Sequence, residues 1–484
     1  MSLALAGARG GFYTVLSQLA GMGLRVVSLV VLARLIAPGV FGSVAIVTSI
    51  VAMLSSLIYL GLPAATAQAP HLSHPARSTL FYLNSAMGFT MACSLFLLAP
   101  LIAELYADEN LVAIARWLAF VPLAAGIGAQ LRQQLIRRLA FVRLAAIDTT
   151  STLVGVIAAL SLALLGYTYV ALIAQAVLAA LAELILVAVI ARWLPGRPGD
   201  WKHEVRPLLR IAGNIFGANT LRNLSRSIVT PVMGVYVSPT QLGLYDRAQQ
   251  LTLIPVSLTV DQLQRVVVPI LSRVRDEPER MLHYMQRFQL VGAYLTSTGF
   301  LLLAALAYPF VITALGQDWV GAAPLIQLIA IGSVFRAAGQ SMQWLFIAGE
   351  RTGTALRLSL WTQPAIAAIT LCGLPWGVGG VALAGSLAWL AYWPVSTITA
   401  ARSVGFPARE LIAGVSRGVL FFALPVSIGA SLANLIPASP PIVLALGIAF
   451  GALTAALLQL APAVRRDCTI VTRTIHLAVR RQRP

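Results

Sequence analysis

The sequence contains one turn pattern twice, as APGVFG (Ala37–Gly42) and as SPTQLG (Ser238–Gly243). In each copy a small residue precedes a proline, and a glycine follows four positions after that proline. The two prolines are 201 positions apart, and so are the two glycines. Proline is tolerated in the first turn of a helix because the N–H that it lacks would have no partner there. The spacing therefore predicts two corresponding turns, each leading into a helix, in the two halves of a repeat.

The composition indicates a membrane protein. Of the 484 residues, 58% are hydrophobic and only 10% are charged, and the mean hydropathy is +0.84. Soluble chains typically have about 25% charged residues. Apolar runs of about 20 residues, the length that a helix needs to cross a bilayer, recur from Gly11 to Ala461. The predicted fold is an all-α polytopic membrane protein, since the long alternating segments of a barrel are missing from the sequence.

About fourteen transmembrane helices are expected, with approximate ranges 11–36, 39–62, 78–105, 111–136, 146–166, 168–191, 208–236, 240–271, 284–314, 320–348, 354–373, 377–400, 411–435 and 441–462. The first apolar run is too long for a cleavable signal peptide and contains Arg25, so it is interpreted as the first spanning helix.

Basic residues are concentrated in alternate loops. The loops after the even-numbered helices contain most of them, whereas the other loops, such as YADEN (Tyr106–Asn110) and GQDW (Gly316–Trp319), are short and nearly free of them. Because basic loops stay on the cytoplasmic side, both termini are predicted to be cytoplasmic. The net charge of +18 is thus a topology signal, and no nucleic-acid partner is expected.

The two repeated turns lie in non-cytoplasmic loops, after predicted helices 1 and 7. Six helices separate them, so both halves enter the membrane in the same direction and form a parallel repeat. This predicts two parallel six-helix lobes around a central cavity, followed by an appended helix pair. The expected domains are an N-terminal lobe (1–191), a cytoplasmic linker (192–207), a C-terminal lobe (208–400), the appended helices (401–464) and a basic cytoplasmic tail (465–484).

Charged residues inside spanning helices are costly, and they are usually functional or paired. The offset of 201 aligns Arg25 with Arg226 and Gln18 with Asn219. Both arginines lie roughly 15 Å from their turns at a helical rise of about 1.5 Å per residue, which is near the middle of the bilayer. Arg222 precedes Arg226 by one helical turn. These five residues are candidates for binding a substrate.

Arg247 and Arg336 complete the predicted substrate-binding set. Two interpretations of the intramembrane arginines stay open: they line a solvated cationic cavity, or they pair with acids. The planar guanidinium group suits bidentate contact with phosphate and stays charged when it is partly desolvated. A cationic cavity would therefore favour an anionic substrate. A lipid-linked diphosphate fits because its head must cross the bilayer while its tail stays in lipid.

The acids inside the membrane are fewer, and they include Asp148, Glu183 and Asp246. Asp148 and Glu183 are expected to lack an adjacent arginine. All three acids are candidates either for counter-ions or for sites that couple transport to a Na⁺ or H⁺ gradient; the membrane potential is another possible energy source. No cofactor, metal site or catalytic residue is expected, because the three cysteines are isolated and no phosphate-binding glycine loop occurs.

Three stretches carry a family resemblance. SPTQLGLYDRAQQLTLIPVSLTVDQLQRVVVPILSRVRDEPERM (Ser238–Met281) resembles a stretch of the polysaccharide transporters, the Wzx-type oligosaccharide flippases of the multidrug/oligosaccharidyl-lipid/polysaccharide exporter superfamily. PGVFGSVAIV (Pro38–Val47) and GQDWVGAAPLIQLIAI (Gly316–Ile331) resemble two further family stretches. The resemblance favours the exopolysaccharide branch, which includes xanthan-type and acetan-type export. Of the candidate arginines, only Arg247 lies in a matched stretch, so the resemblance assigns no role to the others.

The resemblance implies a flippase of the bacterial inner membrane, which moves undecaprenyl-diphosphate-linked oligosaccharide to the periplasmic leaflet by alternating access. It would serve exopolysaccharide or O-antigen-type biosynthesis, together with a polysaccharide polymerase and a chain-length regulator as partners. The alternatives are a multidrug or lipid II transporter of the same superfamily, although a cavity for cationic drugs would be rich in acids. An enzyme, such as a membrane glycan polymerase or ligase, is disfavoured because the external loops are short and present no paired carboxylates.

Overall fold

The computed structural model describes residues 20–58, 72–199, 201–208, 223–256, 259–260, 262–469 and 471. Within these ranges the regular secondary structure is helical, without strands. The chain divides into two compact units, Met1–Gly243 and Leu244–Pro484, here called the N-terminal unit and the C-terminal unit. Three predicted binding residues, Gln18, Asn219 and Arg222, lie outside the described residues.

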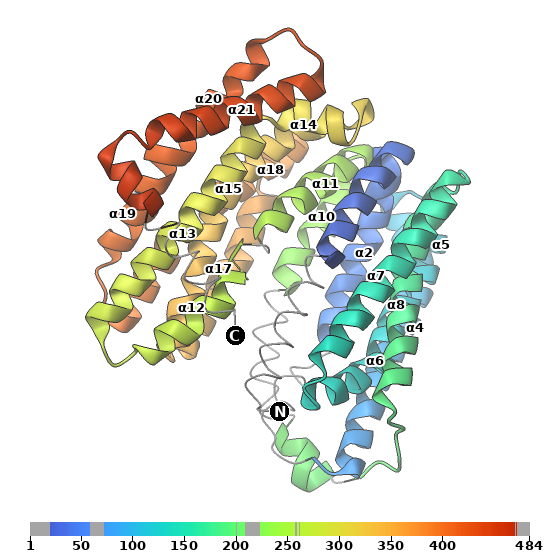
Figure 1. The fold of residues 1–484 in the computed structure, drawn as a ribbon. Coiled ribbons are helices and arrows are strands. Elements are labelled where there is room, and N and C mark those ends of the chain that lie inside the picture. Colours follow the sequence, from blue (N-terminus) through green and yellow to red (C-terminus); the bar gives the residue numbers. More distant parts are fainter. Residues whose placement is uncertain are drawn as a thin grey trace. The chain divides into compact units, whose positions relative to one another are not determined.

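The N-terminal unit is a bundle of long helices (Figure 1). A helix over residues 20–35 comes first. It is followed by α2 (Pro38–Ile58), α4 (His74–Tyr106), α5 (Asn110–Leu118), α6 (Phe120–Arg137), α7 (Phe141–Leu164), α8 (Thr168–Ala191), the π-helical turn η1 (Trp201–Val205), α10 (Val229–Tyr236) and the start of α11 (Pro239–Val256). Helix α7 packs along α8, and α6 packs against both α4 and α8.

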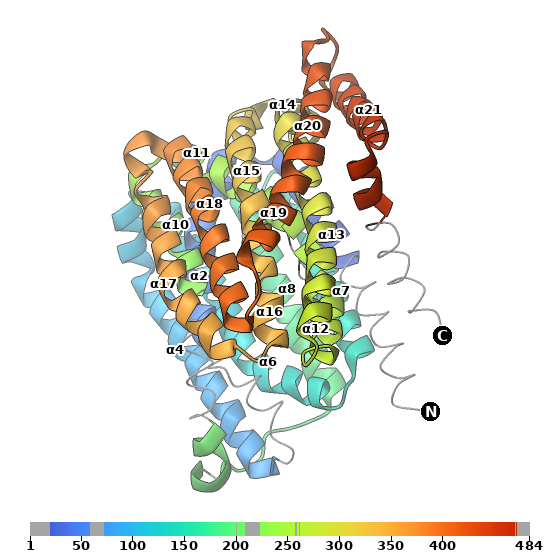
Figure 2. The ribbon, with the colours of Figure 1, turned by 90° about the vertical axis from the view of Figure 1, so that its left-hand side faces the viewer.

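The C-terminal unit contains the rest of α11 and the helices that follow it. These are α12 (Gln262–Arg273), α13 (Pro278–Ala305), α14 (Ala307–Ala314), η3 (Gln317–Trp319), α15 (Ala322–Ser341), α16 (Gln343–Ala348), α17 (Thr352–Leu371), η4 (Leu374–Trp376), α18 (Gly377–Val404), α19 (Ala408–Gly418), η5 (Val419–Ala423), α20 (Leu424–Ser431), η6 (Leu432–Leu435) and α21 (Pro440–Leu458). Helix α15 packs against both α13 and α18, as Figure 2 shows, and α17 packs against α18.

The helices have the length and composition of membrane spans. Among the described residues, ten segments are long and apolar enough to cross a bilayer, and one of them, Thr352–Val404, contains both α17 and α18. The predicted all-α membrane fold is therefore confirmed. The helix count near fourteen stays a prediction, because parts of predicted helices 1, 2, 7 and 8 lie outside the described residues.

The two repeated turns pack against each other within the N-terminal unit. A Cβ atom on Gly42 would lie 1.8 Å from the carbonyl oxygen of Pro239. Reciprocally, a Cβ atom on Gly243 would lie 1.9 Å from the carbonyl oxygen of Pro38. Any side chain would overlap the opposite backbone at these distances, so only glycine lets α2 and α11 begin this close together. One reciprocal contact thus explains why both copies of the turn contain a proline and a glycine at the same spacing.

Left-handed backbone conformations recur in the same order in the two units. Among the described residues, positive φ angles occur at Ala107, Leu139, Gly166 and Arg192 in the N-terminal unit, and at Gly316, Glu350, Gly377 and Gly405 in the C-terminal unit. Corresponding members are 209 to 213 positions apart. A left-handed residue commonly ends a helix, since its N–H then bonds back to the last turn. Residues with a positive φ angle therefore occur in the same order and at similar spacing in the two units, as a parallel repeat would produce.

The predicted linker, 192–207, is folded onto the N-terminal end of α4. The N–H of Gly196 donates to the hydroxyl of Ser78 at 2.9 Å, and the hydroxyl of Thr79 donates to the carbonyl of Gly199 at 2.8 Å. In η1, Glu204 accepts a hydrogen bond from the N–H of Ser73. The compact units divide at Gly243 rather than in this linker. The limits predicted for the six-helix lobes stay a prediction.

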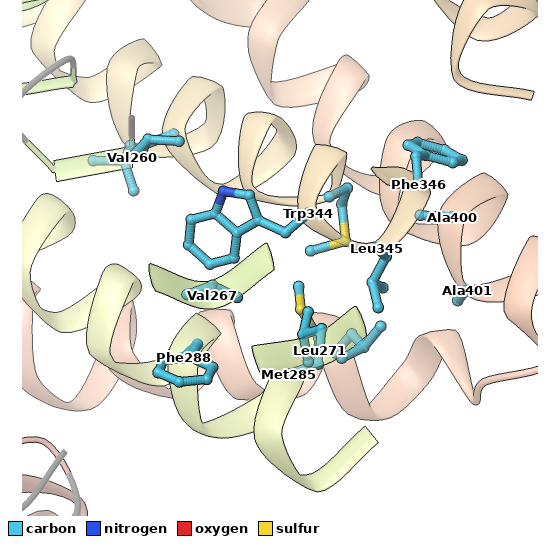
Figure 3. Packing of buried hydrophobic residues seen from close by; sticks show 14 of the residues in the cluster. Val260, Val267, Leu271, Met285, Phe288, Trp344, Leu345, Phe346, Ala400 and Ala401 are labelled. Carbon is cyan, nitrogen blue, oxygen red and sulfur yellow. The ribbon is translucent and has the colours of Figure 1, made fainter. Parts of the chain in front are cut away.

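The core of the C-terminal unit is formed around α16 (Figure 3). Trp344, Leu345 and Phe346 are fully buried and pack in one cluster with Leu271 of α12 and Met285 of α13. These apolar contacts fix the short helix α16 between longer ones. They also fix the turn that follows it, where Glu350 adopts its left-handed conformation.

Candidate functional site

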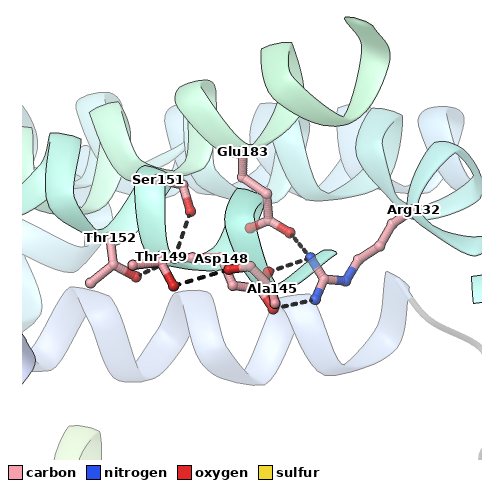
Figure 4. Close-up of polar contacts among 7 residues, drawn as sticks. All are labelled: Arg132, Ala145, Asp148, Thr149, Ser151, Thr152 and Glu183. Atoms are coloured by element: carbon pink, nitrogen blue, oxygen red, sulfur yellow. Dashed lines mark hydrogen bonds and ion pairs between the residues drawn. The ribbon is translucent and has the colours of Figure 1, made fainter. Parts of the chain in front are cut away.

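Helices α6, α7 and α8 bring three charged side chains together in the N-terminal unit (Figure 4). The guanidinium of Arg132 donates to both carboxylate oxygens of Asp148, at 2.7 and 2.9 Å, and to Oε1 of Glu183 at 2.8 Å. The expectation that these two acids lack an adjacent arginine is wrong. Arg132 is 16 residues from Asp148 and 51 residues from Glu183 in the sequence, so only the packing of the three helices reveals the contact.

This triad of Arg132, Asp148 and Glu183 is not buried. The side chains are 30%, 51% and 44% exposed, although each lies in a segment that can span a membrane. At a helical rise of about 1.5 Å per residue, they lie roughly 8 to 12 Å inside the predicted cytoplasmic ends of their helices. Charged groups that face hydrocarbon are costly, so this exposed surface is expected to line a water-filled space.

Arg25 lies at a depth comparable to that of the triad. The side-chain amide of Gln175 on α8 donates to the hydroxyl of Ser28 at 2.9 Å, which ties the helix over residues 20–35 to α8. Arg25 is one turn from Ser28, and Glu183 is about two turns from Gln175, both toward the predicted cytoplasmic side. The rise of about 1.5 Å per residue therefore places Arg25 and Glu183 within about 8 Å of each other in depth.

The N-terminal unit also contains the second arginine of the predicted pair. Arg25 and Arg226 are both described, and both are exposed. Exposure of a guanidinium in a segment that is predicted to span the membrane again suits a solvated wall rather than a lipid-facing surface. The predicted equivalence of the two arginines across the repeat stays a prediction, as does their role in binding a substrate.

In the C-terminal unit, polar residues cluster near the middle of α11. The carboxylate of Asp246 lies 3.4 Å from the guanidinium of Arg247 and accepts a hydrogen bond from the side-chain amide of Gln250 at 2.9 Å. The side-chain amide of Gln249 donates to the hydroxyl of Tyr245, which is almost fully buried. The side chains of Arg247 and Asp246 are only 15% and 17% exposed. The structure therefore provides Asp246 with a counter-ion, one of the two roles predicted for it.

Arg336 on α15 lies over an aromatic ring. Its guanidinium carbon is 4.8 Å from the centre of the Trp389 ring on α18. Close packing of the two helices creates this contact, because a Cβ on Gly332 or Gly339 would collide with Ser386 or Tyr392 of α18, respectively. A guanidinium stacked on an indole face keeps its charge. Trp389 was not predicted from the sequence, since the contact depends on how the two helices pack.

Comparisons with known proteins identify the family. Residues 31–324 match the polysaccharide biosynthesis protein family. The chain belongs to this family. It is 27% identical over 320 residues to the succinoglycan biosynthesis transport protein ExoT of Rhizobium meliloti (strain 1021), and this match covers 66% of the chain but only 64% of ExoT. It is 24% identical over 386 residues to the lipopolysaccharide biosynthesis protein WzxC of Escherichia coli (strain K12), which covers 77% of the chain and 76% of WzxC.

Solved structures show the same fold. The lipid II flippase MurJ, in an inward closed conformation, has a TM-score of 0.74 at 13% identity, covering 92% of this chain and 97% of MurJ. An inward-facing multidrug resistance transporter of the MATE family, in the MOP superfamily, has a TM-score of 0.62 at 12% identity, covering 79% of this chain and 94% of that transporter. The predicted membership in a polysaccharide biosynthesis family is confirmed, and similarity to ExoT is consistent with the exopolysaccharide branch. By their names, ExoT is a transport protein and MurJ a flippase.

Proposed function

We propose that this protein flips oligosaccharides linked to undecaprenyl diphosphate across the bacterial inner membrane, for exopolysaccharide or O-antigen-type biosynthesis. The observation that carries the proposal is an excess of arginine over acid among the candidate residues of each unit. In the N-terminal unit Arg25, Arg132 and Arg226 outnumber two acids, and in the C-terminal unit Arg247 and Arg336 outnumber Asp246. Guanidinium groups suit the diphosphate, the one part of this substrate that is always anionic.

Transport by alternating access requires the non-cytoplasmic side to open. The reciprocal contact of Gly42 and Gly243 joins the two predicted non-cytoplasmic turns, and we infer that it separates in the outward-open state. The closest approaches in this contact are between backbone atoms. The Na⁺ gradient, the H⁺ gradient and the membrane potential are the candidate energy sources, and collapse of each in turn during a transport assay would identify the one used.

The test is an export assay in cells that lack the chromosomal copy. Loss of the protein should cause undecaprenyl-diphosphate-linked oligosaccharide to accumulate on the cytoplasmic side, and a plasmid copy should reverse this. Arg25→Ala and Arg226→Ala should each reduce export at least tenfold, because a charge-assisted hydrogen bond is worth about 1.5–3 kcal/mol. Arg402→Ala, at the end of α18, is the matched control and should export normally.

Two outcomes would contradict the proposal. Wild-type export by both arginine variants, at wild-type protein levels, would remove these residues from the binding site. Absence of any lipid-linked intermediate in the deletion strain, together with efflux of a cationic dye by the purified protein, would favour a multidrug transporter instead. Reporter fusions at both termini would test the predicted cytoplasmic orientation, and co-purification would test the polymerase and the chain-length regulator as partners.

A further inference from the structure

We propose that the triad of Arg132, Asp148 and Glu183 is a carbohydrate subsite that binds hydroxyl groups of the oligosaccharide, separate from the arginines that bind the diphosphate. The inference rests on the proposed function, since it concerns a second part of the same substrate. It assigns to the two acids a ligand, neutral sugar hydroxyls, rather than the counter-ion or coupling roles that the sequence suggests.

The triad presents hydrogen-bond acceptors in a fixed arrangement. Arg132 contacts Asp148 through both of its carboxylate oxygens but Glu183 through Oε1 alone. Each carboxylate oxygen has two lone pairs, so both acids can accept further hydrogen bonds while the guanidinium holds them in place. Side-chain exposures of 51% for Asp148 and 44% for Glu183 leave those acceptors accessible. The hydroxyl groups of a sugar are hydrogen-bond donors of the matching chemistry.

The charge of the triad selects the uncharged part of the substrate. Two carboxylates and one guanidinium have a net charge of −1, which repels a diphosphate. Arg25 is positively charged and lies about 8 Å away in depth, at a rise of about 1.5 Å per helical residue. Charges of opposite sign at these two depths would orient the substrate, with its diphosphate toward Arg25 and its sugars toward the triad.

The fold itself does not need the triad. Between the left-handed residues Leu139 and Gly166 the repeat offset is 211, so Asp148 corresponds to Ser359 of the C-terminal unit. The offsets of 209 to 213 that bracket Arg132 and Glu183 place their counterparts at residues 341–343 and 394–396. None of these residues is charged, yet α17 also packs against α18. A purely structural link between helices is therefore a weaker explanation for the triad than a ligand.

A cation-coupling site is also the weaker explanation. The guanidinium of Arg132 already lies between the two carboxylates, within 2.9 Å of both. A sodium ion would have to displace this group from the position that it occupies. A sugar, in contrast, binds to the outward-facing lone pairs and leaves the ion pairs intact.

The experiment compares two substrates in proteoliposomes containing the purified protein. One is undecaprenyl diphosphate carrying the whole oligosaccharide, and the other is undecaprenyl diphosphate carrying a single sugar. Glu183→Gln and Asp148→Asn should each slow flipping of the first about tenfold, since hydrogen bonds to charged groups are among the strongest, and should change the second less than about twofold. Arg25→Ala should slow both substrates equally. Failure of the proposed function would thus appear with Arg25→Ala, independently of the subsite.

Control variants separate binding from folding. Asp276→Asn, in the loop before α13, removes a carboxylate that is 95% exposed and should flip both substrates normally. The triple variant Arg132→Gln/Asp148→Asn/Glu183→Gln removes all three charges together and leaves no unpaired ion, so it should fold and still lose its preference for the whole oligosaccharide. Equal loss of both substrates in the single variants would overturn the subsite. So would a Glu183→Gln variant whose only defect is lost dependence on Na⁺ or pH.

Discussion

The N-terminal and C-terminal units follow the same backbone path but differ in the charges that they carry along it. Both units turn through left-handed residues at corresponding helix ends, for example at Leu139 and Glu350 and again at Gly166 and Gly377. Between those ends the N-terminal unit has the ionic triad of α6, α7 and α8, whereas the counterparts in the C-terminal unit are uncharged.

The C-terminal unit in turn has a charged contact whose counterpart residues in the N-terminal unit are apolar. Its stacked pair, Arg336 and Trp389, corresponds at the offset of 211 to Ala125 and Leu178 of the N-terminal unit. At these positions, therefore, one unit has apolar or uncharged residues where the other unit has the ionic triad or the stacked arginine. The turns are therefore what the fold requires, whereas the charged groups are specific to one unit and are the better candidates for function.

The largest expected effect is a loss of stability when the contact between the two repeated turns is disrupted. Gly42→Ala and Gly243→Ala each place a Cβ within 2 Å of an opposite carbonyl oxygen, as the 1.8 and 1.9 Å approaches show. Overpacking of this kind costs about 3 kcal/mol, and the loss should be seen as a lower thermal unfolding temperature in detergent. The double variant should cost less than the sum, because one displacement relieves both collisions.

Gly23→Ala is the matched control for the turn contact. No atom lies within 4 Å of a Cβ at Gly23, so this variant should be neutral or slightly stabilising. Equal unfolding temperatures for Gly23→Ala and Gly42→Ala would show that the two turns do not form the contact in the purified protein.

The second prediction tests whether the charges of the triad distinguish the N-terminal unit from the C-terminal unit in stability. Arg132→Ala leaves Asp148 and Glu183 side by side without their shared guanidinium. The groups are partly exposed and solvent screens their repulsion, so the expected loss of stability is only about 1–2 kcal/mol. Further substitution to Arg132→Ala/Asp148→Asn/Glu183→Gln should recover most of it. Gln343→Ala, at the corresponding position of the C-terminal unit, should cost much less in the same thermal measurement. A larger loss there would mean that charge is not what distinguishes the two units.

The sequence predicts the shared features better than the unit-specific ones. The repeated turn is readable because proline and glycine act locally and their spacing survives in the chain. The triad is not readable, because Arg132 and Glu183 are 51 residues apart and meet only through the packing of α6 against α8. The stacking of Arg336 on Trp389 depends on glycines that bring α15 close to α18, and nothing in the sequence pairs those helices.

The linker shows a second limit of prediction. Proline and glycine between residues 192 and 199 suggest an open connection, yet these residues pack on α4. A Cβ on Gly196 would lie 2.9 Å from the ring of His74, so glycine serves close approach here as well as flexibility. Composition alone does not distinguish the two uses of glycine.

The third prediction exchanges the stacked pair for its counterpart in the other unit. Trp389→Leu introduces the residue found at Leu178 and removes the aromatic face from Arg336. A cation–π contact at a partly exposed site is worth about 1 kcal/mol, so unfolding should occur at a slightly lower temperature. Trp389→Phe keeps a weaker aromatic face and should lose about half as much. If Trp389→Leu and Trp389→Phe lose the same amount, packing and not the cation–π contact explains the tryptophan.

The smallest expected effect is the change in stability when glycine replaces two equivalent left-handed residues, one in each unit. Leu139 and Glu350 have φ angles of 53° and 56°, which glycine adopts without steric cost. Leu139 is 61% exposed, so its side chain contributes little packing. Leu139→Gly should therefore raise the free energy of unfolding by about 0.5 kcal/mol. This gain is the relief of left-handed strain, reduced by the larger conformational entropy that glycine loses on folding. Glu350 also forms an ion pair with Arg275, at side-chain exposures of 76% and 41%. Such pairs contribute roughly 0–1 kcal/mol, so Glu350→Gly should be close to neutral.

The dependence of stability on salt should show whether the ion pair with Arg275 causes the difference between Leu139→Gly and Glu350→Gly. An exposed ion pair weakens as ionic strength rises, whereas backbone strain does not depend on salt. In about 1 M salt, where the Debye length is about 3 Å, Glu350→Gly should therefore become as stabilising as Leu139→Gly when both are measured by thermal unfolding. If Glu350→Gly is the more stabilising variant already at low salt, the ion pair with Arg275 contributes nothing. The glutamate would then need another reason for occupying a position that suits glycine, and the pair of turns would differ in function as well as in sequence.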